Sequence, residues 1–462
     1  MPDSGLGPRP AHRLILGYLV AIATGALLLW SPWAAAPGRE IAFVDAVFTA
    51  TSAVSVTGLS TVDTGTCFSP FGQLVILLLL QLGGLGVMTF STFLLLGVSG
   101  RASMAVREAT GEPLGAGSGQ RLGSTLRGVF LLTLAFEAAG ALLLFATWTF
   151  GDGYPADRDW LARAWDAIFH SCAAFCNAGF STFSDNLAGF QGCLATNLII
   201  MVLIVAGGLG FVSLLEIGRG AYFLRKGSAR RISSHTRMAL TVSAVLIVGG
   251  ALLIYLLERG RTLEPLGEGD RVLASFFQSV TARTAGFNTL NIGAMAAPTL
   301  FLLIVLMFVG ASPCGTGGGI KTTTLGVLMA TAWARIRGKG EAQCFGRSVP
   351  HETVVRAAML TILSAAIIGV VLLAFLGTEP AENLGSTGEE GGFLRASFEA
   401  VSAFGTVGLS TGVTAKLSAL GKLLIAALMF IGRVGPLSLG IALSRPSREQ
   451  LVKMPKSDVL VG

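Results

Sequence analysis

Long apolar stretches alternate along the chain with shorter, semi-polar segments. Eight apolar stretches reach the length of about 20 residues that a helix needs to cross a bilayer. They lie near residues 14–33, 71–98, 126–150, 196–218, 238–257, 299–334 (interrupted), 353–377 and 418–444. Between the members of each successive pair lies a segment that is too short or too polar to span, which is typical of a re-entrant loop. The pattern predicts an all-α integral membrane protein with eight transmembrane helices.

The four intervening segments align with one another without gaps. They are DAVFTATSAVSVTGLST (residues 45–61), DAIFHSCAAFCNAGFST (166–182), LASFFQSVTARTAGFNT (273–289) and RASFEAVSAFGTVGLST (395–411). Counted from a shared glycine, every copy has an alanine twelve residues earlier, a phenylalanine ten residues earlier and a threonine three residues later. Such repetition within one chain indicates four copies of one structural unit.

Each unit is therefore expected to contain a spanning helix, a re-entrant pore helix with a glycine turn, and a second spanning helix. The pore helix should begin near the shared Ala-x-Phe and end just before the glycine. Four units, at residues 13–98, 126–218, 238–334 and 353–444, would surround one axis in a pseudo-fourfold arrangement, and the second helix of the third unit would be broken. The connections 99–125, 219–237 and 335–352 carry clusters of Lys and Arg. By the positive-inside rule these loops, together with the ends 1–12 and 445–462, should be cytoplasmic.

Composition supports a membrane location. The 462 residues are 52% hydrophobic and 13% charged, whereas soluble domains carry about 25% charged residues. The polar start of the chain has no cleavable small-residue site, so no signal peptide is expected. The basic loops could contact anionic lipid or a protein partner, and charge alone does not choose between them. No nucleic-acid partner is expected, and the predicted location is the plasma (inner) membrane, multi-pass.

The shared glycines indicate a pathway for cations. A pore helix that ends just before the glycine directs its negative dipole end toward the membrane centre, and glycine allows a positive φ that turns carbonyl oxygens toward the axis. Rings of such carbonyls can replace the hydration shell of an ion. The predicted filter residues are Val56, Thr57, Gly58, Asn177, Ala178, Gly179, Thr284, Ala285, Gly286, Thr406, Val407 and Gly408. Because the residues before the glycines differ between copies, the filter should be short and asymmetric, and the Asn177 side chain could add an oxygen.

Over residues 12–445 the chain resembles the Trk/Ktr/HKT superfamily of potassium and sodium transporters, and within it the Ktr-type translocating subunits. The resemblance implies potassium uptake, with sodium dependence left open, and glycine at all four filter positions favours K⁺. A sodium-selective or Na⁺/K⁺-permeable HKT-like transporter is the alternative. The resemblance also implies a homodimer on cytoplasmic RCK-type regulatory subunits that bind nucleotide. No organic cofactor is expected in this chain.

Two features of the second helices suggest a gate. Residues 310–319 cannot stay helical, because proline costs about 3 kcal/mol and each glycine about 1 kcal/mol within a helix. The segment resembles the family's intramembrane gating loop, and it comprises Gly310, Ala311, Ser312, Pro313, Cys314, Gly315, Thr316, Gly317, Gly318 and Gly319. A phosphate-binding loop is not favoured, because the glycine spacing and a preceding strand are missing. Lys321, just beyond this loop, could repel cations or snorkel to the inner interface.

Arg433 is the second feature, a charge within an apolar span that requires a partner or water. An electrostatic barrier beneath the filter is the preferred interpretation, and the family has a basic residue at this place. A structural ion pair with Glu216 or Glu399 is the alternative.

Other chemistries find little support. The six cysteines show no metal spacing, and a disulfide between Cys67 and Cys193 is left open. An intramembrane enzyme is not expected, because His170 and His235 lack a catalytic companion at a diagnostic spacing.

Overall fold

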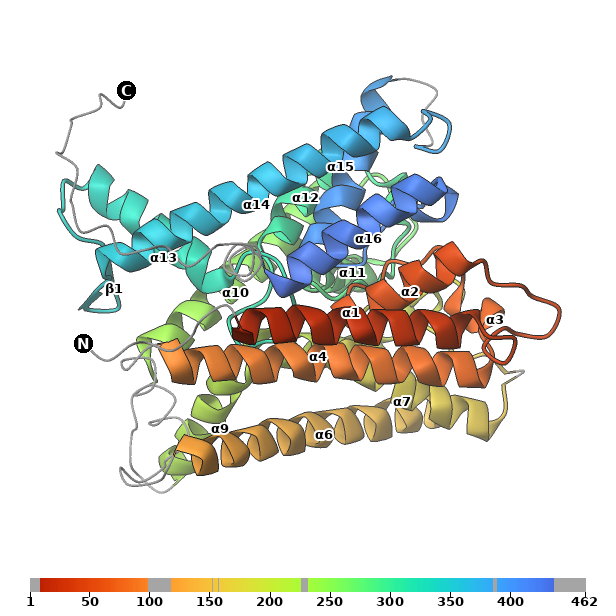
Figure 1. Ribbon diagram of the computed structural model, residues 1–462, viewed down its shortest axis with the longest axis horizontal. Coiled ribbons are helices and arrows are strands. Elements are labelled where there is room, and N and C mark those ends of the chain that lie inside the picture. The colour runs from red at the N-terminus through yellow and green to blue at the C-terminus, as the bar shows by residue number, and fades with distance from the viewer. Residues whose placement is uncertain are drawn as a thin grey trace.

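A computed structural model of the chain describes residues 9–98, 118–151, 153–156, 158–225, 232–384 and 389–435. Its long helices run side by side along the longest dimension of the molecule, with shorter helices between them (Figure 1). Within the described ranges the only strands are a small hairpin of β1 (Gln343–Cys344) and β2 (Arg347–Ser348). The described part of the chain is therefore mostly helical.

The helices follow the same order four times. The first unit contains α1 (Arg9–Trp30), pore helix α2 (Phe43–Ser55), the short α3 (Thr64–Cys67) and α4 (Pro70–Val98). The second contains α6 (Ser118–Phe150), pore helix α7 (Trp160–Cys176), α8 (Leu194–Leu209) and α9 (Phe211–Arg225). The third contains α10 (Ser234–Glu258), pore helix α11 (Glu268–Thr281), α12 (Ala297–Phe308) and α13 (Thr322–Ile336). The fourth contains α14 (His351–Thr378), pore helix α15 (Glu389–Gly405) and α16 (Ala419–Val434).

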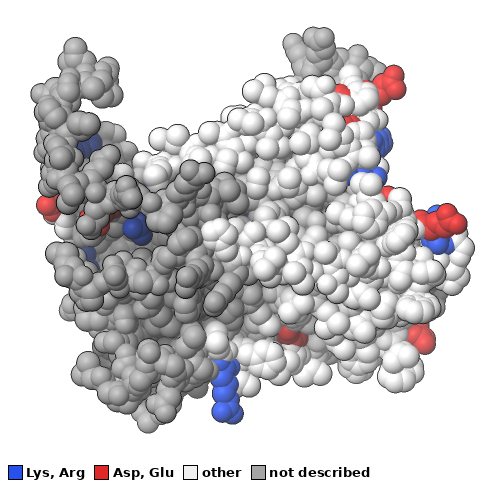
Figure 2. All heavy atoms as spheres, viewed as in Figure 1, with Lys and Arg blue, Asp and Glu red and all other residues white. Residues whose placement is uncertain are grey.

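Charged side chains are sparse over the middle of one face of the molecule. On the face shown in Figure 2, the described Lys, Arg, Asp and Glu residues lie mostly toward the two ends. Three described helices are long and apolar enough to cross a membrane: residues Leu126–Phe150 of α6, all of α10 and all of α14. The bent pair α8 and α9 makes a fourth candidate. Other expected spans appear here as shorter apolar helices, because they are interrupted or only partly described.

The second helix of the second unit is not one straight span, contrary to the expectation for residues 196–218. It breaks at Gly210 (φ +81°), and α8 and α9 meet at 106°. A Cβ at Gly210 would lie 2.5 Å from the Pro313 carbonyl oxygen, so the glycine-rich segment of the third unit packs into this bend. In the fourth unit α16 ends at Val434 and Gly435 has a φ of +86°. The rest of the expected span 418–444 lies outside the described residues.

The pore helices begin earlier than the sequence suggested. Each starts three to seven residues before the shared alanine, which is buried in all four copies. The shared phenylalanine is buried in three copies, but in the third copy Phe276 is 37% exposed and its neighbour Phe277 is fully buried. The gap-free alignment thus identifies the glycines correctly but misassigns this core position by one residue.

Candidate functional site

All four pore segments share an unusual backbone geometry around the aligned glycine. The glycine has a positive φ in every copy: 88° at Gly58, 65° at Gly179, 78° at Gly286 and 92° at Gly408. The residue two positions earlier also has a positive φ, 55° at Val56, 59° at Asn177, 68° at Thr284 and 50° at Thr406. A positive φ is a genuine outlier for a β-branched residue and costs about 1–3 kcal/mol. Strain repeated at one place in four copies indicates a functional site.

Four non-helical segments, one after each pore helix, contain these glycines and close into a ring. Below, each segment is called a strand or a wall of this ring. A Cβ at each glycine would collide with the carbonyl oxygen of the residue before the next glycine in the circle. The distances would be 2.1 Å from Gly58 to Ala178, 2.8 Å from Gly179 to Ala285, 2.4 Å from Gly286 to Val407 and 2.1 Å from Gly408 to Thr57. Real Cβ contacts essentially never fall below 3.0 Å. The copies therefore surround one axis in chain order, and only glycine fits at the four shared positions.

The four pore helices point their carboxyl ends at this ring. The helices α2, α7 and α15 end three residues before their glycines, and α11 ends five residues before its glycine. The carboxyl end of a helix carries about half a negative elementary charge. Four such ends around one axis favour a cation over an anion.

Carboxylates anchor the strand after the glycine in alternate copies only. The shared threonine of the second copy, Thr182, donates to Asp166 at 2.6 Å, and that of the fourth copy, Thr411, donates to Glu399 at 3.2 Å. In the first and third copies the buried hydroxyls of Thr61 and Thr289 have no partner among the described residues. Because the copies follow one another around the axis, the two anchored walls of the ring face each other.

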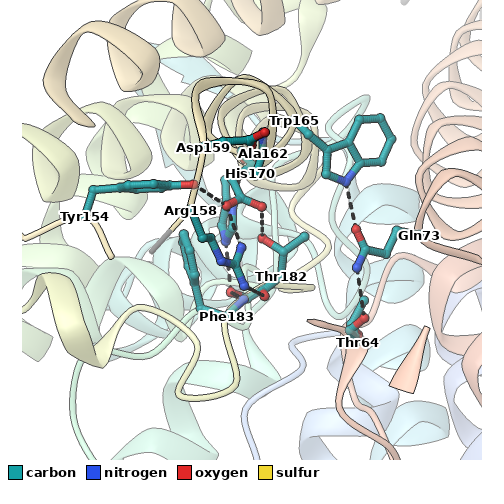
Figure 3. Close-up of polar contacts among 12 residues, drawn as sticks. Thr64, Gln73, Tyr154, Arg158, Asp159, Ala162, Trp165, His170, Thr182 and Phe183 are labelled. Carbon is teal, nitrogen blue, oxygen red and sulfur yellow. Dashed lines mark hydrogen bonds and ion pairs between the residues drawn. The ribbon is translucent and has the colours of Figure 1, made fainter. Parts of the chain in front are cut away.

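The anchors in the second wall belong to a buried polar network (Figure 3). The Asp166 carboxylate accepts from Arg158 Nη1 at 2.6 Å and from the Tyr154 hydroxyl at 2.8 Å. Burial and the bond to Asp166 raise the pKa of Tyr154 above its ordinary value, so that this side chain remains a donor. His170 Nε2 lies 2.9 Å from Ser181 Oγ in the strand after the glycine. This network holds Ser181 and Thr182, which follow Gly179 in the second copy.

The glycine-rich segment of the third unit lies against one face of the ring, where it contacts the side chains of Thr284 and Thr406. We call this face the inner side. The backbone N–H of Gly318 donates to Thr406 Oγ1 at 2.9 Å, and a Cβ at Gly317 would lie 1.9 Å from Thr284 Oγ1. Thr284 and Thr406 are the strained residues of the third and fourth copies. We call residues 309–321, between α12 and α13, the inner loop; it holds all ten residues 310–319 that the sequence singled out. Its glycines fit where side chains would not.

Three cationic side chains bind carbonyl oxygens of the inner loop. Arg283 Nη2 donates to Gly310 at 3.2 Å, Lys321 Nζ to Gly317 at 2.7 Å, and Arg433 Nη1 to Thr316. Arg433 Nη2 also donates to Gly83 in α4 at 2.7 Å. Within the described residues none of these three cations has a carboxylate within 4.0 Å. Positive charge thus accumulates beside the loop without a local counter-charge.

These contacts correct three side-chain hypotheses. Arg433 does not pair with Glu216 or Glu399, because Glu216 accepts from Ser233 at 2.8 Å and Glu399 binds the strand after the fourth glycine. Lys321 does not snorkel, since its ammonium binds loop carbonyls. Cys67 and Cys193 are both free, so the disulfide left open is absent. Within the described residues no group of three His, Cys, Asp or Glu side chains could hold a metal ion.

Some important residues were missed by the sequence reasoning. Asp45 pairs with Lys422 at 2.6 Å and joins the first unit to the fourth. Asp45 and Asp166 both stand thirteen residues before their glycines, which was a usable signal. Glu137, buried in the middle of α6, accepts from Gln81 Nε2 at 2.7 Å. Nothing in the repeat pattern marks Glu137, because it lies outside the aligned segments.

Comparison with known proteins places this geometry in context. A family model described as "TrkH: Cation transport protein" matches residues 19–451. The Ktr system potassium uptake protein B of Bacillus subtilis is 36% identical over 98% of this chain and 97% of its own length. The protein of the same name from Vibrio alginolyticus is 36% identical over 100% and 96%. The potassium/sodium uptake protein NtpJ of Enterococcus hirae is 33% identical over 98% and 97%. The crystal structure of the potassium transporter TrkH from Vibrio parahaemolyticus has the same fold, with a TM-score of 0.73 at 19% identity over 96% of this chain and 86% of that chain.

Proposed function

The chain belongs to the TrkH family of cation transport proteins, which are not enzymes, and we propose that it carries potassium into the cell as the translocating subunit of a Ktr-type system. The observation that carries the proposal is the closed ring at Gly58, Gly179, Gly286 and Gly408. Two relatives named as potassium uptake proteins, each covering at least 98% of the chain, support potassium as the cargo.

In this proposal the ring is the selectivity filter. In an extended chain, successive carbonyl groups point in alternating directions. Positive φ values at the glycine and at the residue two positions earlier change these directions, so that carbonyl oxygens face the axis. K⁺ exchanges its hydration shell for these oxygens, and the four helix ends stabilise it electrostatically. The filter comprises residues 56–58, 177–179, 284–286 and 406–408. Asn177 contributes its backbone, since its side chain packs against Gly207 and Gly208 of α8.

The inner loop and Arg433 form the gate. With the loop against Thr284 and Thr406, its backbone occupies the space on the inner side of the filter. Arg433 links the loop to α4, and the three cations oppose the passage of K⁺ while the loop is in place. Opening requires the loop to leave the axis, which breaks these bonds. The loop is attached at the end of α12 and at the start of α13.

Sodium permeation is the second candidate, favoured by two observations. A relative with 33% identity carries the name potassium/sodium uptake protein. The four filter strands also differ in the residues before their glycines, so the ring is chemically unequal. We include a dependence of potassium uptake on sodium in this second candidate.

We also propose an assembly and an orientation in the membrane. We propose that the four units 13–98, 126–218, 238–334 and 353–444 span the plasma membrane, with both ends and the basic loops 99–125, 219–237 and 335–352 in the cytoplasm. The name Ktr system implies further components, and a homodimer on an RCK-type nucleotide-binding subunit fits the basic inner face.

Rubidium uptake into proteoliposomes containing the purified full chain tests the function. We expect uptake that potassium competes away and that sodium at equal concentration does not. Equal competition by both ions would replace the potassium proposal with the sodium-permeable alternative. No uptake at all above empty liposomes, with the regulatory subunit and nucleotide present, would overturn the transport proposal for this chain.

A further inference from the structure

A pocket of about 460 Å³ is lined by residues 234–238, 323–327 and 344–360. Two of the elements that form it, β1 and the start of α14, lie at one end of the molecule (Figure 1). Its walls come from the beginnings of α10, α13 and α14 and from the β1–β2 hairpin. Its volume is within the range of about 300–1,000 Å³ that is typical of ligand sites. Nothing in the proposed transport mechanism uses this pocket.

Two arginines give the pocket its charge. Arg347 in β2 and Arg356 in α14 both line it, and neither forms an ion pair or side-chain hydrogen bond with any residue that the structure describes. Glu341 accepts from the rim residue Ser348 at 2.6 Å, and Glu352 precedes Arg356 by four residues on α14. No described carboxylate lies within 4.0 Å of either guanidinium, so both arginines keep their donors available for an anionic ligand.

Backbone and hydroxyl donors reinforce this preference. Three helices of 15 residues or more begin at the pocket: Ser234 opens α10, Thr323 and Thr324 lie in the first turn of α13, and Thr353 lies in the first turn of α14. The first N–H groups of a helix lack intrahelical partners and carry partial positive charge, which suits phosphate. Arginine adds a planar fork of donors that matches phosphate oxygens.

Part of the pocket wall is apolar. Met238, Val327 and Ala357 form a separate small hydrophobic cluster in its wall. Nearby on α13 and α14, Met329, Val355 and Met359 are exposed, which fits contact with acyl chains. Trp333 is also exposed on α13, with the Arg337 guanidinium 4.5 Å above its ring. Tryptophan is enriched at the headgroup level of membranes, so the pocket lies where a phospholipid headgroup would be.

We propose that this pocket binds the headgroup phosphate of an anionic phospholipid, with Arg347 and Arg356 as its principal contacts. The apolar wall and the exposed faces of α13 and α14 accommodate the acyl chains, which a free phosphate would leave unused. The proposal rests on the proposed orientation only in naming the inner leaflet as the source of the lipid. Because α13 follows the inner loop directly, a lipid held at its first turn would stabilise one position of the proposed gate.

Native mass spectrometry of the purified full chain, titrated with phosphatidylglycerol, tests the site without relying on transport. The double variant Arg347→Gln/Arg356→Gln should weaken phosphatidylglycerol binding about tenfold or more, since it removes the two guanidinium groups proposed to bind the phosphate directly. The matched control Arg335→Gln/Lys339→Gln removes two exposed cations of α13 and the following turn that do not line the pocket. We expect binding within about twofold of wild type in this control.

Further arms separate the source of the phosphate and guard against misfolding. Arg347→Lys/Arg356→Lys should retain most of the affinity, which a folding defect would not allow. Millimolar inorganic phosphate should leave phosphatidylglycerol bound, and phosphatidylcholine should bind more weakly than phosphatidylglycerol. Equal losses in the pocket variant and the control, displacement by inorganic phosphate, or undiminished binding of phosphatidylcholine would each overturn the proposal. Failure of rubidium uptake would leave these binding results unchanged and would bear only on the transport function.

Discussion

Glu399 in pore helix α15 accepts a hydrogen bond at 2.7 Å from the hydroxyl of Ser410, two residues beyond Gly408 in the fourth unit. The same carboxylate accepts from the backbone N–H of Thr411 at 2.9 Å and from Thr414 at 2.6 Å. One fully buried carboxylate thus binds three residues of the segment that follows Gly408. The second unit places His170 at the corresponding position, nine residues before its glycine, where it binds Ser181.

Replacing this anchor should loosen the filter. We expect Glu399→Gln to lower the free energy of unfolding by about 1–3 kcal/mol, because charge-assisted bonds to buried groups are lost. Selectivity for potassium over sodium should fall, as read from ion competition in rubidium uptake. The matched control is Thr49→Val, since Thr49 occupies the same position in the first unit and its hydroxyl has no described partner. An equal loss of selectivity in both variants would contradict the anchoring role.

Adding one carbon atom to the ring should damage selectivity directly. In Gly58→Ala the new Cβ would start 2.1 Å from the Ala178 carbonyl oxygen, so two units must move apart. We expect sodium to compete with rubidium markedly better than in wild type. Gly412→Ala is the control, because Gly412 has a φ of +87° but nothing within 4 Å of its Cβ position. That variant carries about 1–3 kcal/mol of backbone strain without a collision. If both variants lose selectivity alike, strain rather than ring closure controls the filter.

Removing the charge at Arg433 should favour the open state of the inner loop. Arg433→Gln weakens the bonds to Thr316 and Gly83 and lowers the local positive charge. We expect faster rubidium uptake in the absence of the regulatory subunit, while ion preference stays the same because the filter is untouched. Arg433→Lys keeps the charge and should stay closer to wild type. Slower uptake in Arg433→Gln, or a changed ion preference, would count against a gating role.

The ion pair between Asp45 and Lys422 should help to close the circle of units. A double-mutant cycle with Asp45→Asn and Lys422→Met should give a coupling of about 1 kcal/mol in thermal unfolding, near the upper limit for exposed pairs. Both side chains are largely buried, so salt should screen this coupling only partly. The control pair, Arg259 and Glu268, lies 3.9 Å apart with both side chains more than half exposed, and should show no measurable coupling. If the Asp45–Lys422 and Arg259–Glu268 pairs gave equal coupling energies, the contact between the first and fourth units would not contribute to stability.

Sequence reasoning reached the helices and glycines because both leave periodic marks. The span lengths, the pore segments and the interruption at residues 310–319 all follow from apolar runs, fixed offsets and helix-breaking composition. The bend at Gly210 was missed, because it depends on the Pro313 carbonyl of a distant segment. The positive φ at Val56 was missed as well, because a β-branched residue disfavours it. Val56 is the left-handed carboxyl-terminal cap of α2, and its N–H donates to helix carbonyl oxygens.

Side-chain partners were the least predictable part of the site. Arg433 and Lys321 were recognised as unusual charges, but their acceptors are backbone carbonyls of the inner loop. Backbone acceptors exist at every residue and leave no trace in composition. Asp45 and Asp166, in contrast, share an offset from the glycine and could have been paired with the repeat from the start.

The position of the inner loop has a consequence for how such a pathway can be assembled. The space on the inner side of the ring holds one segment, whose glycines already touch the third and fourth walls. A tetramer of identical subunits would bring four such loops to one axis, where they would exclude one another. Joining the four units in a single chain removes this restriction, because each wall can then diverge separately. The third unit supplies the loop, and the fourth unit supplies Arg433, which binds it. Four identical subunits could not differ from one another in this way.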